Sequence, residues 1–366
     1  MRIYGVFRGF PGLGRVVAGI SILSSLKEKG HVVKAYSYLQ GIQALKDHGI
    51  DQMMDEQPTE HQISAIGLNP IGEVAEKLIE IICTDAPDMV IVDGEALFIS
   101  TLTMVFPREK VLALLNPADL YSEYQALSTK EFYRRNYLAA KSVIVHGVNK
   151  DNIILPENDQ DCDILRTSTI LRQSIIQANV IERTDIVAIL GGGCSHSSEC
   201  FWKSTLEMGS RIIEAANLLH NERFMIYCND KGISEKLSHY EKTENVHIVS
   251  DYTLPEQIYS SAKAVLCRAG RNTISEVLYL KIPAILMSSS GDYRSAEQER
   301  NIDQACECCP EIVFRSNNGE SGQQLADKIK IACEASLSTG FSFVPGNDDA
   351  TEYIMNKLMK LKRDEA

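Results

Sequence analysis

The sequence lacks long hydrophobic runs and an excess of positive charge. None of its apolar stretches approaches the ~18 residues that a membrane-spanning helix requires. With 37 Lys and Arg against 49 Asp and Glu, the formal net charge is −12. This acidic balance argues against general binding of DNA or RNA, because nucleic-acid phosphates need a basic surface. We therefore expect a cytoplasmic protein without a nucleic-acid partner, at most peripheral at the inner face of a membrane.

The ten cysteines follow no spacing that is typical of disulfides or zinc ligands. Cys306, Cys308 and Cys309 lie close together in the chain, but no second Cys or His pair accompanies them. Zinc sites need such a second pair, so this group is a poor ligand set. We expect free thiols in a reducing compartment and no bound metal.

Short apolar runs alternate with helical patterns along the whole chain. MVIVD (Met89–Asp93) and VLALL (Val111–Leu115) are typical of buried strands, whereas Val16, Ile20 and Leu23 recur at helical spacing. This alternation predicts an α/β protein in which helices cover both faces of parallel sheets. The 366 residues suffice for two domains of ~150 residues each.

The strand pattern restarts at DIVAIL (Asp185–Leu190), after a polar stretch without a clear period. We therefore expect a Rossmann-like domain over residues 1–168, a linker over 169–184 and a second Rossmann-like domain over 185–348, with a cleft between the domains. A last helix is expected over 349–366, crossing back to the first domain. Its basic and apolar side chains would also allow weak contact with an anionic membrane surface.

Three glycine-containing turns follow predicted strands. The first, RGFPGLGR (Arg8–Arg15), has Gly12 and Gly14 where a ligand can approach the backbone at a helix start, although a tight turn without a ligand is the alternative. Val17 stands where a dinucleotide fingerprint needs glycine, which argues against bound NAD. The second turn, GGGCSHSS (Gly191–Ser198), adds hydroxyl donors to three glycines.

The third turn lies within CRAGRNTISEVLYLKIPAILM (Cys267–Met287), which predicts a strand, a turn, a helix and a strand. Gly270 precedes the helix, whose first N–H groups have no partner within the helix and can therefore bind a phosphate. Glu276, one turn further on, can accept two hydroxyl hydrogen bonds, as from a ribose. The alternative is that Glu276 lies on the surface and pairs with Lys281.

These motifs resemble those of the GT-B glycosyltransferases that use nucleotide-sugar donors, most closely family 28 and its UDP-glycosyltransferase-like relatives. The resemblance rests on GLGR (Gly12–Arg15), PDMVIVDGE (Pro87–Glu95), the triple glycine, and CRAG…TISEVLYLKIPAILM followed by AEQERN (Ala296–Asn301). It implies a GT-B fold with an acceptor half and a donor half. It also implies transfer of a hexose from a nucleotide donor, expected to be UDP, to a small-molecule, lipid-linked or glycan acceptor, with inversion and without a metal.

The resemblance also assigns roles to individual residues. The acceptor-side loop contains Gly12 and Gly14, and the acceptor is expected to lie near Leu39–Ile66 and Asn116–Asn136. The nucleotide base would lie near Ser250–Leu254. The donor would be bound by Gly191, Gly192, Gly193, Ser195, His196, Arg268, Gly270, Arg271, Asn272, Thr273, Glu276, Glu297 and Gln298.

The general base is where the sequence departs from the family, because Arg15 stands where a histidine is common and a guanidinium stays protonated. Asp93 or Glu95, at the carboxyl end of a predicted strand, could take the proton instead. Alternatively, Arg15 binds an anionic acceptor or the diphosphate and the base lies elsewhere. A third possibility is a protein that binds a nucleotide sugar or glycan without transferring it.

Two other functions fit the same features. A nucleotide-sugar epimerase with this architecture would bind the same UDP-sugar and need no acceptor. A non-catalytic nucleotide-sugar-binding subunit would bind the donor without turnover.

Overall fold

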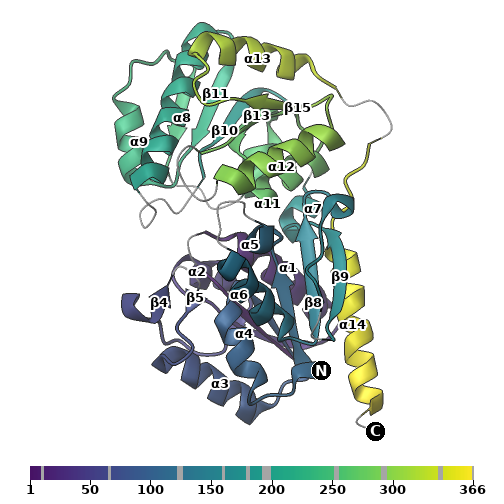
Figure 1. Ribbon diagram of the computed structural model, residues 1–366. Helices are drawn as coiled ribbons and strands as arrows, with labels where there is room; N and C mark the ends of the chain where they lie inside the picture. Colours follow the sequence, from purple (N-terminus) through teal and green to yellow (C-terminus); the bar gives the residue numbers. More distant parts are fainter. Residues whose placement is uncertain are drawn as a thin grey trace. The chain divides into compact units, whose positions relative to one another are not determined.

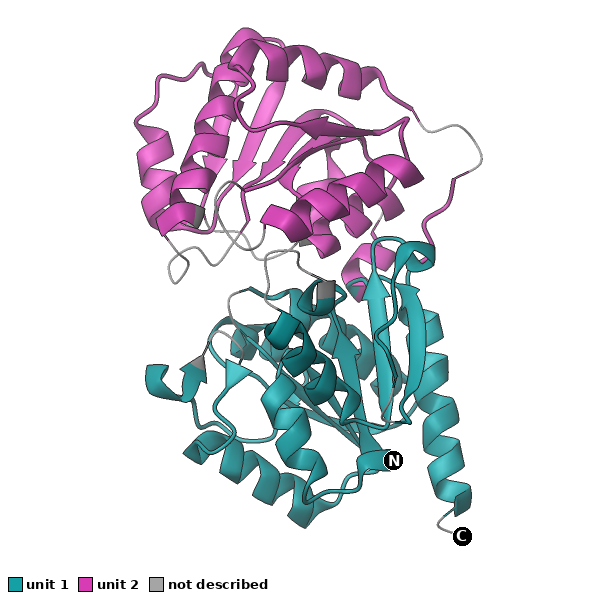
Figure 2. Ribbon diagram, viewed as in Figure 1, with its two compact units in different colours: residues 1–172, 345–366 teal, residues 173–344 magenta. Residues whose placement is uncertain are grey.

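The computed structural model (Figure 1) describes residues 1–9, 12–64, 67–121, 127–158, 161–178, 182–191, 199–250, 255–289, 295–336 and 341–364. The chain divides into two compact units (Figure 2). Unit 1 comprises residues 1–172 and 345–366, and unit 2 comprises residues 173–344.

Unit 1 contains a seven-stranded parallel sheet in the order β3-β2-β1-β6-β7-β8-β9. Its strands are β1 (Arg2–Phe7), β2 (Val32–Tyr36), β3 (Asp51–Gln52), β6 (Met89–Asp93), β7 (Val111–Leu115), β8 (Ser142–Gly147) and β9 (Asp163–Ser168), with a separate antiparallel pair of β4 (Ile63–Ser64) and β5 (Gly67–Leu68). Its helices are α1 (Gly14–Glu28), α2 (Gln40–Asp47), α3 (Glu73–Asp85), α4 (Ala96–Thr103), α5 (Ala118–Tyr121), α6 (Leu127–Leu138) and α14 (Asn347–Asp364), with 3₁₀ turns at Glu60–Gln62, Arg108–Lys110 and Lys150–Asn152.

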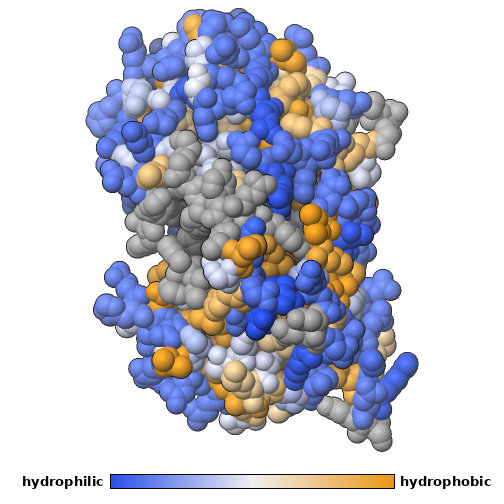
Figure 3. All heavy atoms as spheres, in the orientation of Figure 1, coloured by the Kyte–Doolittle hydropathy of each residue, from blue (hydrophilic) through white to orange (hydrophobic). Residues whose placement is uncertain are grey.

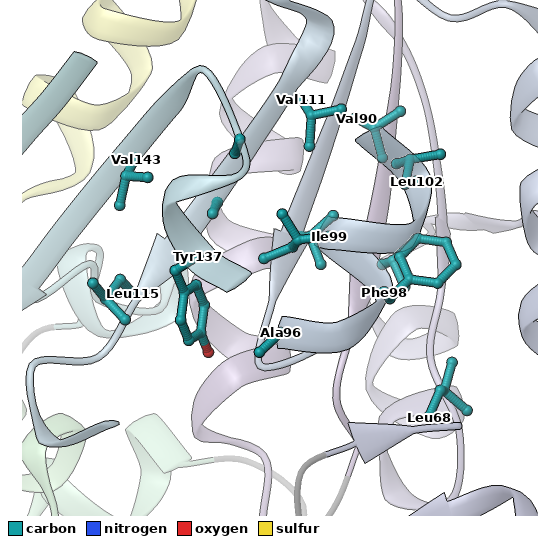
Figure 4. Close-up of a cluster of buried hydrophobic side chains, with 14 of the residues drawn as sticks. Leu68, Val90, Ala96, Phe98, Ile99, Leu102, Val111, Leu115, Tyr137 and Val143 are labelled. Carbon is teal, nitrogen blue, oxygen red and sulfur yellow. The ribbon is translucent and has the colours of Figure 1, made fainter. Parts of the chain in front are cut away.

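Alternation along the strands divides the hydrophobic core of unit 1 between the two faces of this sheet. Val90 and Val92 of β6 belong to one cluster, with side chains of α4 and α6, and Figure 4 shows Val90, Ile99 and Tyr137 within it. Ile91, between the two valines, belongs to the opposite cluster. Strand side chains point alternately to the two faces, so β6 is buried on both sides, which a continuous apolar run predicts.

The C-terminal helix α14 packs within unit 1. Its residues Ala350, Ile354 and Leu358 join the same cluster as the apolar face of α1. The hydroxyl of Tyr353 donates to the backbone carbonyl of Asp163, at 2.9 Å. The helix begins at Asn347, two residues before the predicted start.

Unit 2 contains a six-stranded parallel sheet in the order β12-β11-β10-β13-β14-β15. Its strands are β10 (Asp185–Ile189), β11 (Arg223–Tyr227), β12 (Val246–Val249), β13 (Ala262–Arg268), β14 (Ala284–Met287) and β15 (Val313–Ser316). Its helices are α7 (Gln173–Ile176), α8 (Glu199–Leu218), α9 (Lys231–Ser238), α10 (Pro255–Ser260), α11 (Arg271–Tyr279), α12 (Ser295–Cys308) and α13 (Gly322–Glu334).

In each sheet the first strand in the sequence lies in the interior. Later strands are added first on one side of it and then on the other, so the strand order reverses once. In unit 1 the reversal lies between β1 and β6, and in unit 2 it lies between β10 and β13. At such a switch point the loops leave the carboxyl ends of neighbouring strands in opposite directions, and ligands of α/β proteins bind there. The predicted α/β class with two Rossmann-like parallel sheets is confirmed, and each sheet offers one such position.

Polar side chains cover most of the described surface on the face shown in Figure 3. Among the helices of the described residues, none combines the length and the apolar character that crossing a membrane would take.

Candidate functional site

The switch point of unit 1 holds a buried arginine between two aspartates. Arg15 lies in the first turn of α1, and its Nη1 donates to Oδ1 of Asp93, the last residue of β6, at 3.1 Å. Its Nη2 lies 2.7 Å from each carboxylate oxygen of Asp119 in α5. The hydroxyl of Tyr137 in α6 lies 3.4 Å from Nη1 and donates to Oδ2 of Asp119 at 2.9 Å. We call Arg15, Asp93, Asp119 and Tyr137 the arginine cluster.

Burial makes the charges of the arginine cluster strongly interdependent. The side chains of Arg15, Asp93 and Asp119 are 11%, 0% and 16% exposed. Burial alone would raise the pKa of Asp119, but the charges of Arg15 and Arg8 and the hydrogen bonds from Arg15 and Tyr137 outweigh it, so this pKa lies below its ordinary value. Burial alone would lower the pKa of Arg15, but Asp119, Tyr137 and Asp93 outweigh this effect, so the pKa lies well above its ordinary value. Both charges therefore persist in the folded protein.

Glu95, the second carboxylate that the sequence suggested as a base, immediately precedes α4 and is only 1% exposed. Its Oε1 accepts from the hydroxyl of Tyr38 at 2.7 Å, and its Oε2 accepts from the backbone N–H of Leu68 at 2.6 Å. Burial raises its pKa, against the opposing effects of the Leu68 N–H and of Arg8. A Cβ on Gly67 would lie 2.1 Å from Oε2, so the backbone of β5 lies directly against this carboxylate.

The turns around the arginine cluster depend on one glycine in particular. Gly94 has φ +83°, and a Cβ there would lie 2.8 Å from Cβ of Arg8 and 3.3 Å from Cγ of Arg15. Glycine alone adopts this conformation readily and leaves room for both arginines. Of the two glycines predicted for the acceptor-side loop, Gly12 faces open space and Gly14 begins α1.

The structure brings together Arg15 and Asp93, which the sequence suggested, and adds Asp119 and Tyr137, which it did not single out as a site. Asp119 comes four residues after the end of β7, the neighbour of β6 in the sheet. A polar residue just beyond the carboxyl end of a parallel strand is the same signal that pointed to Asp93. Three donor bonds of Arg15 go to the two aspartates, so its geometry argues against the alternative in which it binds an anionic acceptor or diphosphate.

In unit 2, the switch point holds Arg268 and the N-terminus of α11. Arg268 ends β13, is 8% exposed, and its Nη2 donates to the buried hydroxyl of Thr205 in α8 at 2.6 Å. Its Nη1 lies 3.7 Å from the position that a Cβ on Gly191 would take, and Gly191 has φ +87°. The arginine therefore lies beside Gly191, the first residue of the glycine turn that follows β10.

The first turn of α11 begins after Gly270, and no side-chain hydrogen bond from the described residues caps it there. Gly270 faces open space, since nothing lies within 4 Å of the position of its Cβ. Arg271 is buried, whereas Asn272 and Thr273 are partly exposed. An open helix N-terminus beside an arginine favours a negatively charged group.

Glu276 lies one turn further into α11 and is 1% exposed, so the alternative that it is a surface residue is wrong. The hydroxyl of Tyr259, on α10, donates to its Oε2 at 2.8 Å. Burial and the nearby Glu276 raise the pKa of Cys267 to about 12, so this thiol stays protonated. Tyr259 is a partner that the sequence did not point to.

Two side chains of helix α12 form hydrogen bonds to the residues that follow β13 and β14. The side-chain oxygen of Gln298 accepts from the backbone N–H of Ser289 at 2.6 Å and from its hydroxyl at 2.9 Å. Asn301, one turn on, donates to the carbonyl of Ala269 at 3.1 Å, directly before Gly270. Gln298 is buried, and its two hydrogen bonds hold Ser289, two residues after the end of β14.

The neighbouring Glu297 is partly exposed. Gly192, Gly193, Ser195 and His196, and residues 251–254 of the predicted base-binding segment, lie outside the described residues. Within the residues that the structure describes, there is no group of three or more His, Cys, Asp and Glu arranged to hold a metal ion.

Comparison with known proteins gives a family for unit 2 and a fold for the whole chain. Residues 186–336 match the glycosyltransferase family 28 C-terminal domain. No curated protein matches the sequence at a significant level.

Several solved structures share the fold at low sequence identity. MurG of Acinetobacter baumannii is 13% identical with a TM-score of 0.57, over 98% of this chain and 99% of that chain. The UDP-GlcNAc 2-epimerase of Neisseria meningitidis, bound to UDP-GlcNAc, is 14% identical with a TM-score of 0.64, over 98% and 100%. The spinosyn forosaminyltransferase SpnP is 11% identical with a TM-score of 0.62, over 98% and 95%. Residues 186–336 therefore match the C-terminal domain of glycosyltransferase family 28, and the whole chain shares the two-domain GT-B fold of these solved structures.

Proposed function

We propose that the protein transfers a hexose from a UDP-sugar to an acceptor hydroxyl, with inversion at the anomeric carbon and without a catalytic metal. One observation carries the proposal. Within the matched domain, the N-terminus of α11 opens at Gly270 at the switch point of the sheet, with Arg268 beside it. This combination suits a diphosphate.

The donor would be held by backbone and side chains of unit 2. The N–H groups of Arg271, Asn272 and Thr273, in the first turn of α11, would donate to the diphosphate. Glu276, whose orientation is fixed by Tyr259, would accept from the ribose hydroxyls. Glu297 and Gln298 would contact the hexose, and Gly191 would face the phosphates.

Bond cleavage leaves negative charge on the departing diphosphate. The dipole of α11 and the charges of Arg268 and Arg271 would stabilise that charge without a metal ion, as preorganised donors do. The acceptor hydroxyl attacks the anomeric carbon from the opposite side of the sugar. Its proton would pass to a carboxylate of unit 1, where the sequence suggested Asp93 or Glu95.

A pair of variants at Gly270 tests the donor site. Gly270 has φ −75° and ψ 138° and faces open space, so serine or aspartate fits there and both are favourable residues before a helix. Gly270→Asp should keep the thermal stability of the protein but repel the diphosphate and abolish the stabilisation by UDP. Gly270→Ser, the matched neutral control, should keep that stabilisation. Equal stabilisation by UDP in both variants would refute the donor site.

A screen of nucleotides and UDP-sugars by thermal shift then identifies the donor, since a ligand of the native state raises its melting temperature. Release of UDP in the presence of acceptors, measured with the best donor, tests transfer. Binding without UDP release over the whole acceptor panel would favour a non-catalytic nucleotide-sugar-binding subunit.

Epimerisation of the UDP-sugar is the second candidate. It is favoured by the similarity to the Neisseria meningitidis epimerase over 98% of this chain and by the two aspartates that flank Arg15, one at the end of β6 and one in α5. Such a pair could remove and return a proton at a sugar carbon. Incubation with UDP-GlcNAc alone, followed by NMR of the sugar, would show an epimer for this function and unchanged sugar for a transferase.

A further inference from the structure

Three carboxylates lie near the switch point of unit 1, and they differ in access to solvent. Asp93 is fully buried, and Glu95 is 1% exposed. Asp119 is 16% exposed at its side chain. A base must come within hydrogen-bond reach of the hydroxyl that it deprotonates. Of these three carboxylates, Asp119 is the most exposed and is therefore the most accessible to an acceptor.

The hydrogen bonds of the two more buried carboxylates also serve the fold. Glu95 accepts from Tyr38 and Leu68 with its two oxygens and lies against the backbone of β5 at Gly67. Asp93 accepts from Arg15 at the end of a central strand. Their contacts join segments of unit 1 to each other.

We propose that Asp119 is the carboxylate that takes the proton from the acceptor hydroxyl, and that Arg15 is the positioning residue that holds it. This inference rests on the proposed transferase function. It places the reacting group after β7, within the segment Asn116–Asn136 expected to meet the acceptor.

The chemical step balances without a further reactant. The acceptor oxygen forms a bond to the anomeric carbon while the bond from that carbon to the diphosphate oxygen breaks, and its electron pair leaves with UDP. The acceptor proton moves to an Oδ of Asp119. Asp119 then releases this proton to water, which restores the carboxylate for the next turnover.

The geometry of Arg15 fits a positioning role. Its Nη2 contacts both oxygens of Asp119, and Tyr137 donates to Oδ2, so the carboxylate has one fixed orientation. The positive charge keeps Asp119 ionised and therefore able to accept a proton. An arginine at this position thus does not deprive the site of a base, because the base is its partner.

Chemical rescue distinguishes a reacting carboxylate from a structural one. In Asp119→Ala, Nη2 of Arg15 loses its partner and can bind formate in the vacated space. With the donor found by thermal shift, UDP release by this variant should fall by about 100-fold or more, as for loss of a general base. Added formate should raise the rate with concentration. Asp93→Ala should show no such rescue, and neither should the double variant Arg15→Met/Asp119→Ala.

Two controls keep the result interpretable. Asp161→Ala removes an exposed aspartate that pairs with Lys141 elsewhere in unit 1, and it should leave UDP release unchanged. Asp119→Asn, nearly isosteric, keeps an oxygen acceptor for Arg15, which still pairs with Asp93. It should be inactive but remain folded, as its stabilisation by UDP would show, if Asp119→Ala proves unstable. UDP should stabilise each of these variants, since the donor site lies in unit 2.

The outcomes separate this inference from the proposed function. Wild-type protein that neither binds UDP nor releases it from any UDP-sugar refutes the proposed function. Wild-type protein that is active, with Asp119→Ala and Asp119→Asn equally active, overturns the role of Asp119. Inactive Asp119 variants without formate rescue, or rescue of Asp93→Ala instead, also overturn it.

Discussion

Replacing Arg15 by methionine tests the electrostatic role of the arginine cluster. Methionine keeps the apolar part of the side chain and removes the guanidinium, so Asp93 and Asp119 both lose their charged partner. Removing one partner of a buried ion pair costs about 3–5 kcal/mol, because it leaves an uncompensated buried charge. A domain is stable by about 5–15 kcal/mol in total. Arg15→Met should therefore unfold at a markedly lower urea concentration than wild type at neutral pH.

The pH dependence of this loss has a definite sign. In the wild type the pKa of Asp119 is lower in the folded protein than its ordinary value. Its stabilising effect is therefore present above the unfolded pKa of ~3.9 and is lost as the pH falls through the lower folded pKa. Without Arg15, burial acts largely unopposed and raises this pKa. The stability deficit of Arg15→Met should thus be largest at neutral pH and shrink on mild acidification.

The measurement is urea unfolding of both proteins at neutral and mildly acidic pH. Arg135→Met is the matched control, because Arg135 pairs with Glu131 on α6 and its side chain is 69% exposed. Exposed pairs of this kind contribute little, so the control should unfold close to wild type at both pH values. If Arg15→Met unfolds at the same urea concentration as Arg135→Met, or if its deficit grows on acidification, the reasoning is wrong.

Three further predictions concern single side chains. Glu276→Gln should weaken UDP binding by about 1–3 kcal/mol, because a charged acceptor for the ribose is lost; calorimetry with UDP and 2′-deoxy-UDP should show the loss for UDP and little for the deoxy compound. Tyr259→Phe should weaken UDP binding by a smaller amount, about 0.5–1.5 kcal/mol, by releasing the carboxylate of Glu276, and an unchanged affinity would refute its positioning role. Gly94→Ala should destabilise the protein by about 1–3 kcal/mol in urea unfolding, since it forces a side chain into a positive-φ conformation against Arg8. Gly270→Ser, in open space before a helix, should not.

The apolar runs predicted the central strands well. Met89–Asp93 and Val111–Leu115 have the predicted bounds. Both runs consist mainly of consecutive aliphatic residues, and such a run is typical of a strand that is buried on both faces of a sheet. Strand β9 (Asp163–Ser168) was missed, because it is an edge strand of mixed polarity beside β8.

The candidate site could be predicted only in part. Arg15, Asp93 and Glu95 stood out because each lies next to a strand end or a glycine turn. Their partners did not, because the bonds of Arg15 to Asp93, Asp119 and Tyr137 join residues 78, 104 and 122 positions apart. No local pattern reports a contact over such a distance.

The sequence by itself determined the α/β class, the position of most central strands and the resemblance of the donor motif, since all three depend on local periodicity and short motifs. The tertiary structure alone decided which charges meet. The order of the strands places β6 between β1 and β7, and this brings the residues that follow the three strands to one edge of the sheet. Burial there couples Arg15 to two aspartates, and only Asp119 of the three carboxylates keeps appreciable contact with solvent.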